Sequence, residues 1–250
     1  MKARMIALQA GVVAAVVVLW QVGADRGWLD EFFFGSPSGV LDVLGQWARQ
    51  GTLLSDTAVT VGVLVVGWVA GVVLGSVLGI GLFAAPRVYA VVSPFLAFLN
   101  SVPRMVFYPF FGILLGFGFA SKVGLVVFVI LFFAVLNVLT GLSQVDGDLV
   151  AHVRVVGGNR WVVLRSVYLP SIAGWLLASS RITFGFALQA TLISEFFGPA
   201  SGLGYRMVAG QGAFEIDQVW AAIGTTVVLA LLIDGALQLV RRRLIAWQSA

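Results

Sequence analysis

The residues best suited to chemistry gather between positions 146 and 170, in the stretch DGDLVAHVRVVGGNRWVVLRSVYLP. This stretch holds the sole histidine of the chain, three arginines and two of the eleven acidic residues. A catalytic or metal site needs several such groups that converge. His152 has no nearby carboxylate pair and no second metal ligand at a suitable spacing. The pattern therefore favours a binding surface over a catalytic or metal centre.

Signatures of other enzyme classes are weak or missing. The chain has no cysteine, which excludes thiol catalysis, disulfides and cysteine metal sites. It has no G-x-x-x-x-G-K-[ST] loop, so we expect no nucleotide site on this chain. Gly202-Leu203-Gly204 lacks the strand and helix context of a dinucleotide site. We expect no catalytic residue, no metal ion and no cofactor bound by this chain.

The first half of the 146–170 stretch predicts a short capped helix. Asp146 is a suitable N-cap, because its carboxylate can accept from the unpaired N–H groups of the first turn. Apolar residues then recur at helical spacing, at Leu149, Val150, Val153 and Val156. Gly157-Gly158 should end the helix, because glycine adopts left-handed backbone angles without a Cβ clash.

The second half predicts another short helix at an angle to the first. Asn159 can cap a helix from Arg160 to about Val167, and Leu169-Pro170 should end it before the next span. The alternative is a solvated loop between two spans. The apolar stripe and Trp161 argue against that alternative, because a purely solvated loop does not need them.

The composition indicates an integral membrane protein. Of 250 residues, 60% are hydrophobic and only 10% are charged, whereas soluble domains carry roughly a quarter charged residues. The net charge of +4 comes from basic residues that lie beside hydrophobic runs. Such residues set membrane orientation, so we expect a lipid membrane and no nucleic acid as a partner.

The hydrophobic runs predict an all-α protein with about six transmembrane helices. They cover residues 6–22, 53–84, 89–119, 123–142, 170–197 and 219–240. We interpret the first as an uncleaved anchor span; a cleaved signal peptide is the alternative, because Val22-Gly23-Ala24 resembles a weak cleavage site. Ser36-Pro37-Ser38 and the following apolar residues predict a capped amphipathic helix on the outer surface.

Glycines line one face of the second hydrophobic run. They lie four residues apart, at Gly67, Gly71, Gly75 and Gly79. A stripe of small residues lets another helix approach closely. We expect that helix to belong to the same chain; a seam between two copies is the alternative.

The third hydrophobic run is broken by Pro94, Pro103 and Pro109. Broken backbone at membrane depth survives only inside protein or beside a water-filled cavity. Arg104 in this region and Arg181 in the fifth run are therefore candidates for a solute path, together with Tyr108. For Arg104, an arginine whose charged end reaches the membrane surface is an equally open interpretation.

The distribution of basic residues predicts that both termini are cytoplasmic. With the N-terminus inside, nine basic residues flank the cytoplasmic side: Lys2, Arg4, Arg87, Arg154, Arg160, Arg165, Arg241, Arg242 and Arg243. Four lie outside: Arg26, Arg49, Lys122 and Arg206. This orientation places the 146–170 stretch in the cytoplasm.

The 146–170 stretch resembles the cytoplasmic EAA loop of the permease subunits of bacterial ABC importers. In that family a V-D-x-x-L-x-E-A-A-x-x-x-G-A-x-x-W pattern runs on to L-P. The chain matches it at Val145-Asp146, Leu149, Gly157, Arg160-Trp161 and Leu169-Pro170. Ala151, His152 and Val153 stand in place of the triplet that names the loop. The family's glutamate is thus missing here, whereas the glycine elbow and the apolar stripe are kept.

The resemblance extends over most of the chain from Phe34 onward. FGSPSGVLDVL, SVPRMVFYPFFGILLGFGFASK, SSRITFGFAL, ISEFFG and SGLGY are similar, in this order, to segments of the nitrate/sulfonate/taurine-type subgroup. Phe107 and Tyr108 stand where that subgroup usually has smaller aliphatic residues.

The resemblance implies the type I permease fold of ABC importers and a function in ATP-driven uptake by alternating access. It implies an ATPase-coupling loop at 143–169, with contacts at Asp146, Leu149, His152, Val153, Gly157, Arg160, Trp161 and, directly after the loop, Pro170. Residues 1–34 would form an anchor span and outer loop, and residues 35–250 the permease domain.

The same resemblance implies the assembly and the cargo. The implied partners are two ABC ATPase subunits that use ATP, an extracytoplasmic solute-binding protein and a second copy of this chain in a bacterial inner membrane. The implied solute is a small anion, such as a sulfonate or nitrate, or a vitamin precursor. The alternative function is that of a self-contained secondary carrier or channel.

Overall fold

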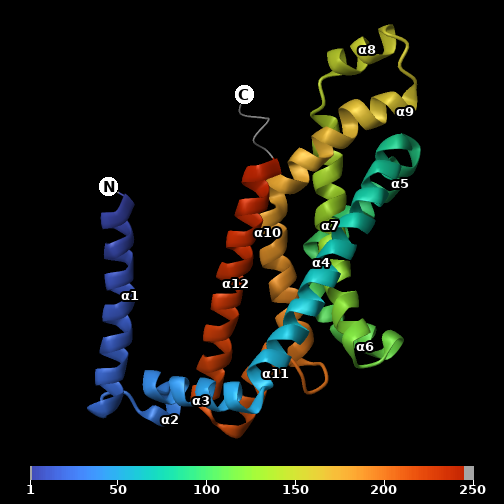
Figure 1. The fold of residues 1–250 in the computed structure, drawn as a ribbon. Helices are drawn as coiled ribbons and strands as arrows, with labels where there is room; N and C mark the ends of the chain where they lie inside the picture. The colour runs from blue at the N-terminus through green and yellow to red at the C-terminus, as the bar shows by residue number, and fades with distance from the viewer. Residues whose placement is uncertain (1, 245–250) are drawn as a thin grey trace. The chain divides into compact units, whose positions relative to one another are not determined.

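The computed structural model describes residues 2–244 and shows a helical protein without β-strands in that range (Figure 1). The last six residues of the expected permease domain, 245–250, lie outside the described residues, as does Met1. The elements are α1 (Lys2–Asp25), α2 (Glu31–Phe34), α3 (Pro37–Gln50), α4 (Thr52–Ala84), α5 (Pro86–Ser101), η1 (Arg104–Phe107), α6 (Tyr108–Leu115), α7 (Phe119–Ser143), α8 (Gly147–Val155), α9 (Arg160–Val163), η2 (Leu164–Tyr168), α10 (Leu169–Phe196), α11 (Leu203–Ala213) and α12 (Ile216–Leu244).

The long helices confirm the prediction of an all-α membrane protein. Within residues 2–244, five stretches are long and apolar enough to cross a membrane: Ala7–Asp25, Thr52–Ala84, Phe119–Ser143, Arg160–Phe196 and Ile216–Leu239. A sixth span results if α5 and the η1–α6 segment, which meet at a bend of 92°, count as one. The predicted break of the third hydrophobic run is thus confirmed at Pro103, whereas Pro94 lies inside α5 and Pro109 in the first turn of α6.

The described residues fall into two compact units. The described residues of the first unit come from Met1–Thr60 and Pro199–Leu229, and those of the second come from Val61–Gly198 and Ala230–Ala250. The expected division into an anchor segment 1–34 and a permease domain 35–250 follows sequence patterns and stays a prediction.

In the first unit, the C-terminal end of α1 is held by tryptophans. Trp20 Nε1 donates to the carbonyl of Gly35 at 3.1 Å, and the Trp20 ring meets the Trp220 ring edge-on at 5.3 Å. Trp220 Nε1 donates in turn to the carbonyl of Phe34 at 3.0 Å. Most apolar side chains of α1 before Trp20 are exposed, which suits a helix that contacts lipid.

The α3 helix confirms the prediction of a capped amphipathic segment. Ser36 Oγ accepts from the backbone N–H of Gly39 at 3.1 Å, and Pro37 occupies the first turn. The buried face of α3 carries Trp47, which packs against Ala221 and Ala222 of α12. The amphipathic pattern therefore reflects packing within the first unit.

An ion pair holds the start of α11 in the first unit. Asp56 of α4 accepts from Arg206 Nε at 2.6 Å and from the backbone N–H of Gly202 at 3.0 Å. The hydroxyl of Thr60 accepts from the N–H of Leu203 at 2.9 Å. These contacts use side chains of α4 to satisfy backbone donors that a helix N-terminus leaves unpaired.

In the second unit, the glycine stripe of α4 faces α7. A Cβ atom placed on Gly67, Gly71, Gly75 or Gly79 would lie within 2.9 Å of an atom of α7. The nearest atoms belong to Val126, Ile130, Leu131 and Val138. Packing within one chain, the predicted use of this stripe, is confirmed.

Replacing Gly75 by alanine should destabilise the protein by about 1–3 kcal/mol, because the new methyl group would meet the Leu131 carbonyl oxygen at 2.5 Å. Gly81→Ala on the same helix is the matched control, since no atom lies within 4 Å of its Cβ position. Thermal unfolding of the purified protein in detergent compares the two. Equal melting temperatures would contradict the close approach of α4 and α7.

Candidate functional site

The two-helix loop between α7 and α10 contains α8 and α9, which project beyond the ends of both spans (Figure 1). Asp146 Oδ1 accepts from the backbone N–H of Asp148 at 2.9 Å. The predicted N-cap is confirmed, and α8 begins at Gly147. Its last turn carries Arg154, whose positive charge interacts favourably with the negative end of the helix dipole.

A glycine elbow ends α8 as the sequence predicts. Gly157 has φ +88°, and its N–H donates to the carbonyl of Arg154 at 3.0 Å. The N–H of Gly158 donates to the carbonyl of Val153 at 2.8 Å. This pair of bonds is a Schellman motif, in which the left-handed position suits glycine because it has no Cβ. The elbow is therefore a defined turn.

The second helix of the loop starts as predicted but does not stop as predicted. Asn159 Oδ1 accepts from the N–H of Val162 at 3.0 Å, so the cap is confirmed. The expected end at Leu169-Pro170 is wrong, because α9, the π-helical turn η2 and α10 follow one another without a break. Proline lacks an N–H and crowds the carbonyl four residues earlier. The wider turn of η2, where Leu169 N–H bonds to the Leu164 carbonyl, lets the helix continue through Pro170.

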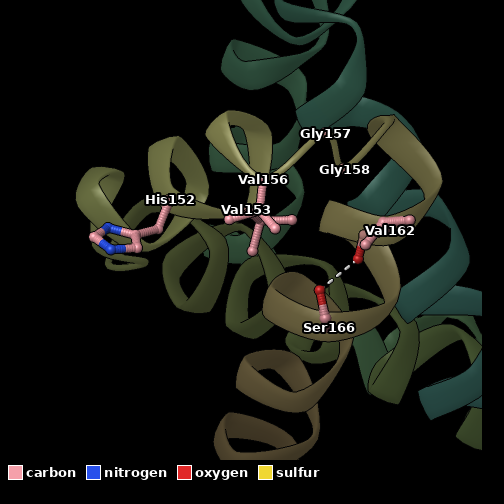
Figure 2. Close-up of a pocket in the computed structure, with 7 residues that line it drawn as sticks. All are labelled: His152, Val153, Val156, Gly157, Gly158, Val162 and Ser166. Atoms are coloured by element: carbon pink, nitrogen blue, oxygen red, sulfur yellow. Dashed lines mark hydrogen bonds between the residues drawn. The ribbon is translucent and has the colours of Figure 1, made fainter.

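A groove of about 520 Å³ lies between α8 and α9. Its lining comprises His152, Val153, Val156, Gly157, Gly158, Val162 and Ser166. In Figure 2 the side chain of His152 points away from the elbow, and the hydroxyl of Ser166 donates to the carbonyl of Val162 at 2.6 Å. The groove is mainly apolar, so it suits an apolar contact better than bond chemistry.

Large apolar side chains of the loop are unusually exposed. Val155 is 87% exposed, Val156 84% and Trp161 64%. Of the predicted coupling residues, Asp146, Leu149, His152, Gly157, Arg160 and Trp161 are exposed, while Val153 and Pro170 are half-buried. An exposed apolar patch with polar residues around it is typical of a protein–protein contact.

Arg104 connects the broken span to α7. Its Nη1 donates to the carbonyl of Val129 at 3.3 Å, and its Nη2 donates to Asn100 Oδ1 at 3.2 Å. The guanidinium carbon lies 4.5 Å from the centre of the Phe133 ring. The side chain is half-buried. These contacts satisfy a backbone carbonyl and a polar side chain near the break.

Tyr108 lies wholly inside the second unit. Its side chain is 0% exposed, and its ring lies 6.3 Å from the Phe197 ring in a stacked arrangement. The buried hydroxyl has no hydrogen-bond partner among the described residues. It approaches Gly198, where a Cβ atom would lie 2.9 Å from the Tyr108 oxygen and 2.7 Å from Lys122 Cε. Its predicted place in a solute path remains a prediction.

Arg181 forms an ion pair that sequence reasoning missed. Its Nε lies 3.0 Å from Asp234 Oδ1, and the two side chains are 70% and 21% exposed. Gln238 Nε2 donates to the other oxygen of Asp234 at 2.8 Å. An acidic residue within an apolar span usually pairs with a base, and that rule was the available signal.

The described contacts do not bring Arg104, Tyr108 and Arg181 together into one site. Arg104 faces α7, Tyr108 contacts Phe197 at the end of α10, and Arg181 pairs with α12. Among residues 2–244, no three His, Asp or Glu side chains come close enough to hold a metal ion. The two-helix loop is therefore the most fully assembled of the candidate sites.

Comparison with known proteins yields one family. Residues 71–246 match the family described as "Binding-protein-dependent transport system inner membrane component". The chain is similar to the taurine transport system permease protein TauC of Escherichia coli, at 26% identity over 98% of this chain and 91% of the relative. It is also similar to a putative aliphatic sulfonates transport permease protein, SsuC of Bacillus subtilis, at 24% identity over 95% and 86%. The riboflavin transport system permease protein RibX of Chloroflexus aurantiacus is 25% identical over 94% and 88%.

Solved structures of ABC transporters share the fold. An amino acid ABC transporter crystallised with histidines superposes with a TM-score of 0.65 at 16% identity, over 80% of this chain and 97% of that chain. The MetNI methionine ABC transporter in an inward-facing conformation gives 0.65 at 21% identity, over 74% and 92%. At these identities the likeness shows the fold, which is that of ABC importer permeases.

Replacing Arg104 by alanine should lower the melting temperature of the purified protein, because the Val129 carbonyl and Asn100 lose a charged donor. Loss of such a bond costs about 1.5–3 kcal/mol. Arg104→Lys keeps the charge but not the two-nitrogen geometry, and should recover only part of that loss. An unchanged melting temperature would contradict this structural role of Arg104, whether or not uptake is impaired.

Proposed function

The chain belongs to the family of inner membrane components of binding-protein-dependent transport systems, and from that premise we propose that it couples ATP hydrolysis in a partner subunit to solute uptake by alternating access. ATP and the ATPase activity would belong to a cytoplasmic ABC subunit, with no cofactor held by this chain. A self-contained carrier or channel is not favoured by the family match.

The observation that carries the proposal is the exposed two-helix loop. Val155, Val156 and Trp161 expose apolar surface that a partner would cover. The Schellman turn at Gly157 and the cap at Asn159 make the loop a defined shape. ATP-driven closure of the ATPase subunits would push on α8 and α9, and the unbroken path through η2 would pass the motion to α10.

The proposed coupling surface consists of eight residues of the loop and its end: Asp146, Leu149, His152, Val153, Gly157, Arg160, Trp161 and Pro170. The groove beside the elbow, lined by Val153, Val156 and Val162, would accept an apolar side chain of the ATPase. In the EAA pattern that the loop resembles, an alanine stands at the position of His152, and in Figure 2 the His152 side chain points away from the other lining residues. It can therefore contact the ATPase without filling the groove.

The proposed assembly contains two copies of this chain, two ATPase subunits and an extracytoplasmic solute-binding protein. The basic residues on the proposed cytoplasmic flanks outnumber those outside, which supports cytoplasmic termini in a bacterial inner membrane. The structural relatives named as whole ABC transporters are consistent with such partners.

The proposed solute is a small organic anion of the sulfonate type. Relatives named for taurine and aliphatic sulfonates support this choice, and Arg181 supplies an exposed positive charge within a span. Arg104, Tyr108 and Arg181 are the proposed path residues. The relative named for riboflavin keeps a vitamin-type solute as the second candidate.

Purification of the tagged chain from its native membrane tests the proposal directly. We expect an ABC ATPase to co-purify in mild detergent, with ATP hydrolysis that a solute-binding protein and its solute stimulate. Mass spectrometry and a phosphate-release assay provide the readouts. Recovery of the chain without any ATPase would contradict the proposed assembly and favour a self-contained carrier.

Replacing Gly157 by valine should uncouple ATP hydrolysis from uptake. A residue with a Cβ costs about 1–2 kcal/mol in the left-handed region, so the elbow would open and misplace α8 against the ATPase. Gly157→Asn is the matched control, because asparagine tolerates this backbone conformation. Uptake and ATP hydrolysis of reconstituted importer would be measured together. Equal coupling in both variants would remove the elbow from the mechanism.

A further inference from the structure

Arg181 presents a largely exposed positive charge near the middle of the apolar helix α10. It is the thirteenth residue of α10, about 18 Å along the helix at 1.5 Å per residue. Its side chain is nevertheless 70% exposed. A guanidinium at this depth is costly to place against lipid, so it calls for a polar surrounding such as a water-filled path.

The other arginines with described contacts in the helices are used differently. Both Nη atoms of Arg104 donate to groups of the protein. Arg206 pairs with Asp56, and these side chains are only 26% and 9% exposed. Arg181 alone among these three combines an ion pair with a largely open guanidinium. Its pairing thus does not serve to hide the charge.

In the Arg181–Asp234 ion pair, the two Nη atoms of the Arg181 guanidinium stay available to another partner. Asp234 engages Nε, so the two Nη atoms, which donate to no described residue, can serve as a fork for another partner. Both oxygens of Asp234 are occupied, one by Arg181 and the other by Gln238. Asp234 is thereby held in place and fixes the direction of the guanidinium.

We propose that Arg181 binds the anionic group of the transported solute and that Asp234 is a positioning residue for it. This inference rests on the proposed function as an importer of small organic anions. The fork of an arginine matches the paired oxygens of a sulfonate or carboxylate. A neutral solute lacks the two anionic oxygens that this fork can bind, so the site discriminates against it.

Asp234 also limits how tightly the anion is held. Its negative charge lies close to the guanidinium and opposes the anion at a longer distance. A transport site must bind strongly enough to admit the solute and weakly enough to release it. Removal of this charge, with the orientation of Arg181 retained, should tighten binding and slow release.

The experiment uses the complete importer, with ATPase and binding protein, in proteoliposomes, and ethanesulfonate as the probe. Arg181→Gln should raise the KM for uptake by about tenfold or more, since a charge-assisted contact is lost. Asp234→Asn keeps an oxygen for Arg181 Nε, and Gln238 can rotate its amide to accept from the new amide. This variant should lower both KM and maximal rate. An unchanged KM in both variants would overturn the inference.

The charge-exchanged variant Arg181→Asp/Asp234→Arg separates binding from architecture. If the pair serves only to join α10 to α12, the exchange restores KM, and the inference is overturned. If Arg181 contacts the solute, the exchanged protein assembles but uptake stays impaired. Arg206→Gln is the matched control at a shielded ion pair, and should reduce the yield of assembled importer without a change in KM.

The design also distinguishes failure of the inference from failure of the proposed function. Normal uptake of ethanesulfonate by the wild type with unaffected variants would overturn only the role of Arg181. Absence of uptake and of stimulated ATP hydrolysis with ethanesulfonate in the wild type would overturn the anion proposal and this inference together. Assembly of each variant is checked by size-exclusion chromatography before uptake is measured.

Discussion

The bilayer interior supplies no water to backbone or charged groups, so each such group must find its partner within the protein or beside a water-filled space. The broken third span shows how the chain meets this constraint. The helices on either side of the break meet at 92°. Arg104, from the first turn after the break, bonds to a carbonyl of α7 and to Asn100 of α5. The glycine stripe of α4 adds close contact with α7 on the same unit, where hydrophobic burial in lipid contributes little.

The three arginines with described contacts in the helices have different surroundings, and these differences separate architecture from function. Arg206 and Asp56 lie in a shielded pair that also holds a helix N-terminus. The Nη atoms of Arg104 donate to the backbone carbonyl of Val129 and to the side-chain amide of Asn100. Arg181 is paired but open, which is why it is the residue proposed to contact the solute. The three arginines differ in the exposure of their side chains and in which guanidinium nitrogen is paired. Residue type alone would not separate them.

The two-helix loop connects a surface of defined shape to the long helix α10. Caps at Asp146 and Asn159 and the Schellman turn at Gly157 determine its shape by local bonds. The π-helical turn then carries the helix past Pro170 into α10, so no loop interrupts the path from the exposed surface to the span. A push on the loop can thus reach α10 without a flexible segment in between.

Local features could be predicted from the sequence because they depend on neighbours in the chain. Hydrophobic runs predict the spans, prolines predict the broken helix, and capping residues and glycines predict the elbow. The tertiary structure alone decided the rest, because it depends on residues far apart in the chain. It pairs Arg181 with Asp234, buries Tyr108 among aromatic rings and places α7 against the glycine stripe. It also shows that the helix continues through Pro170, because the π-helical turn η2 accommodates a residue without an N–H. The sequence pattern does not reveal this turn.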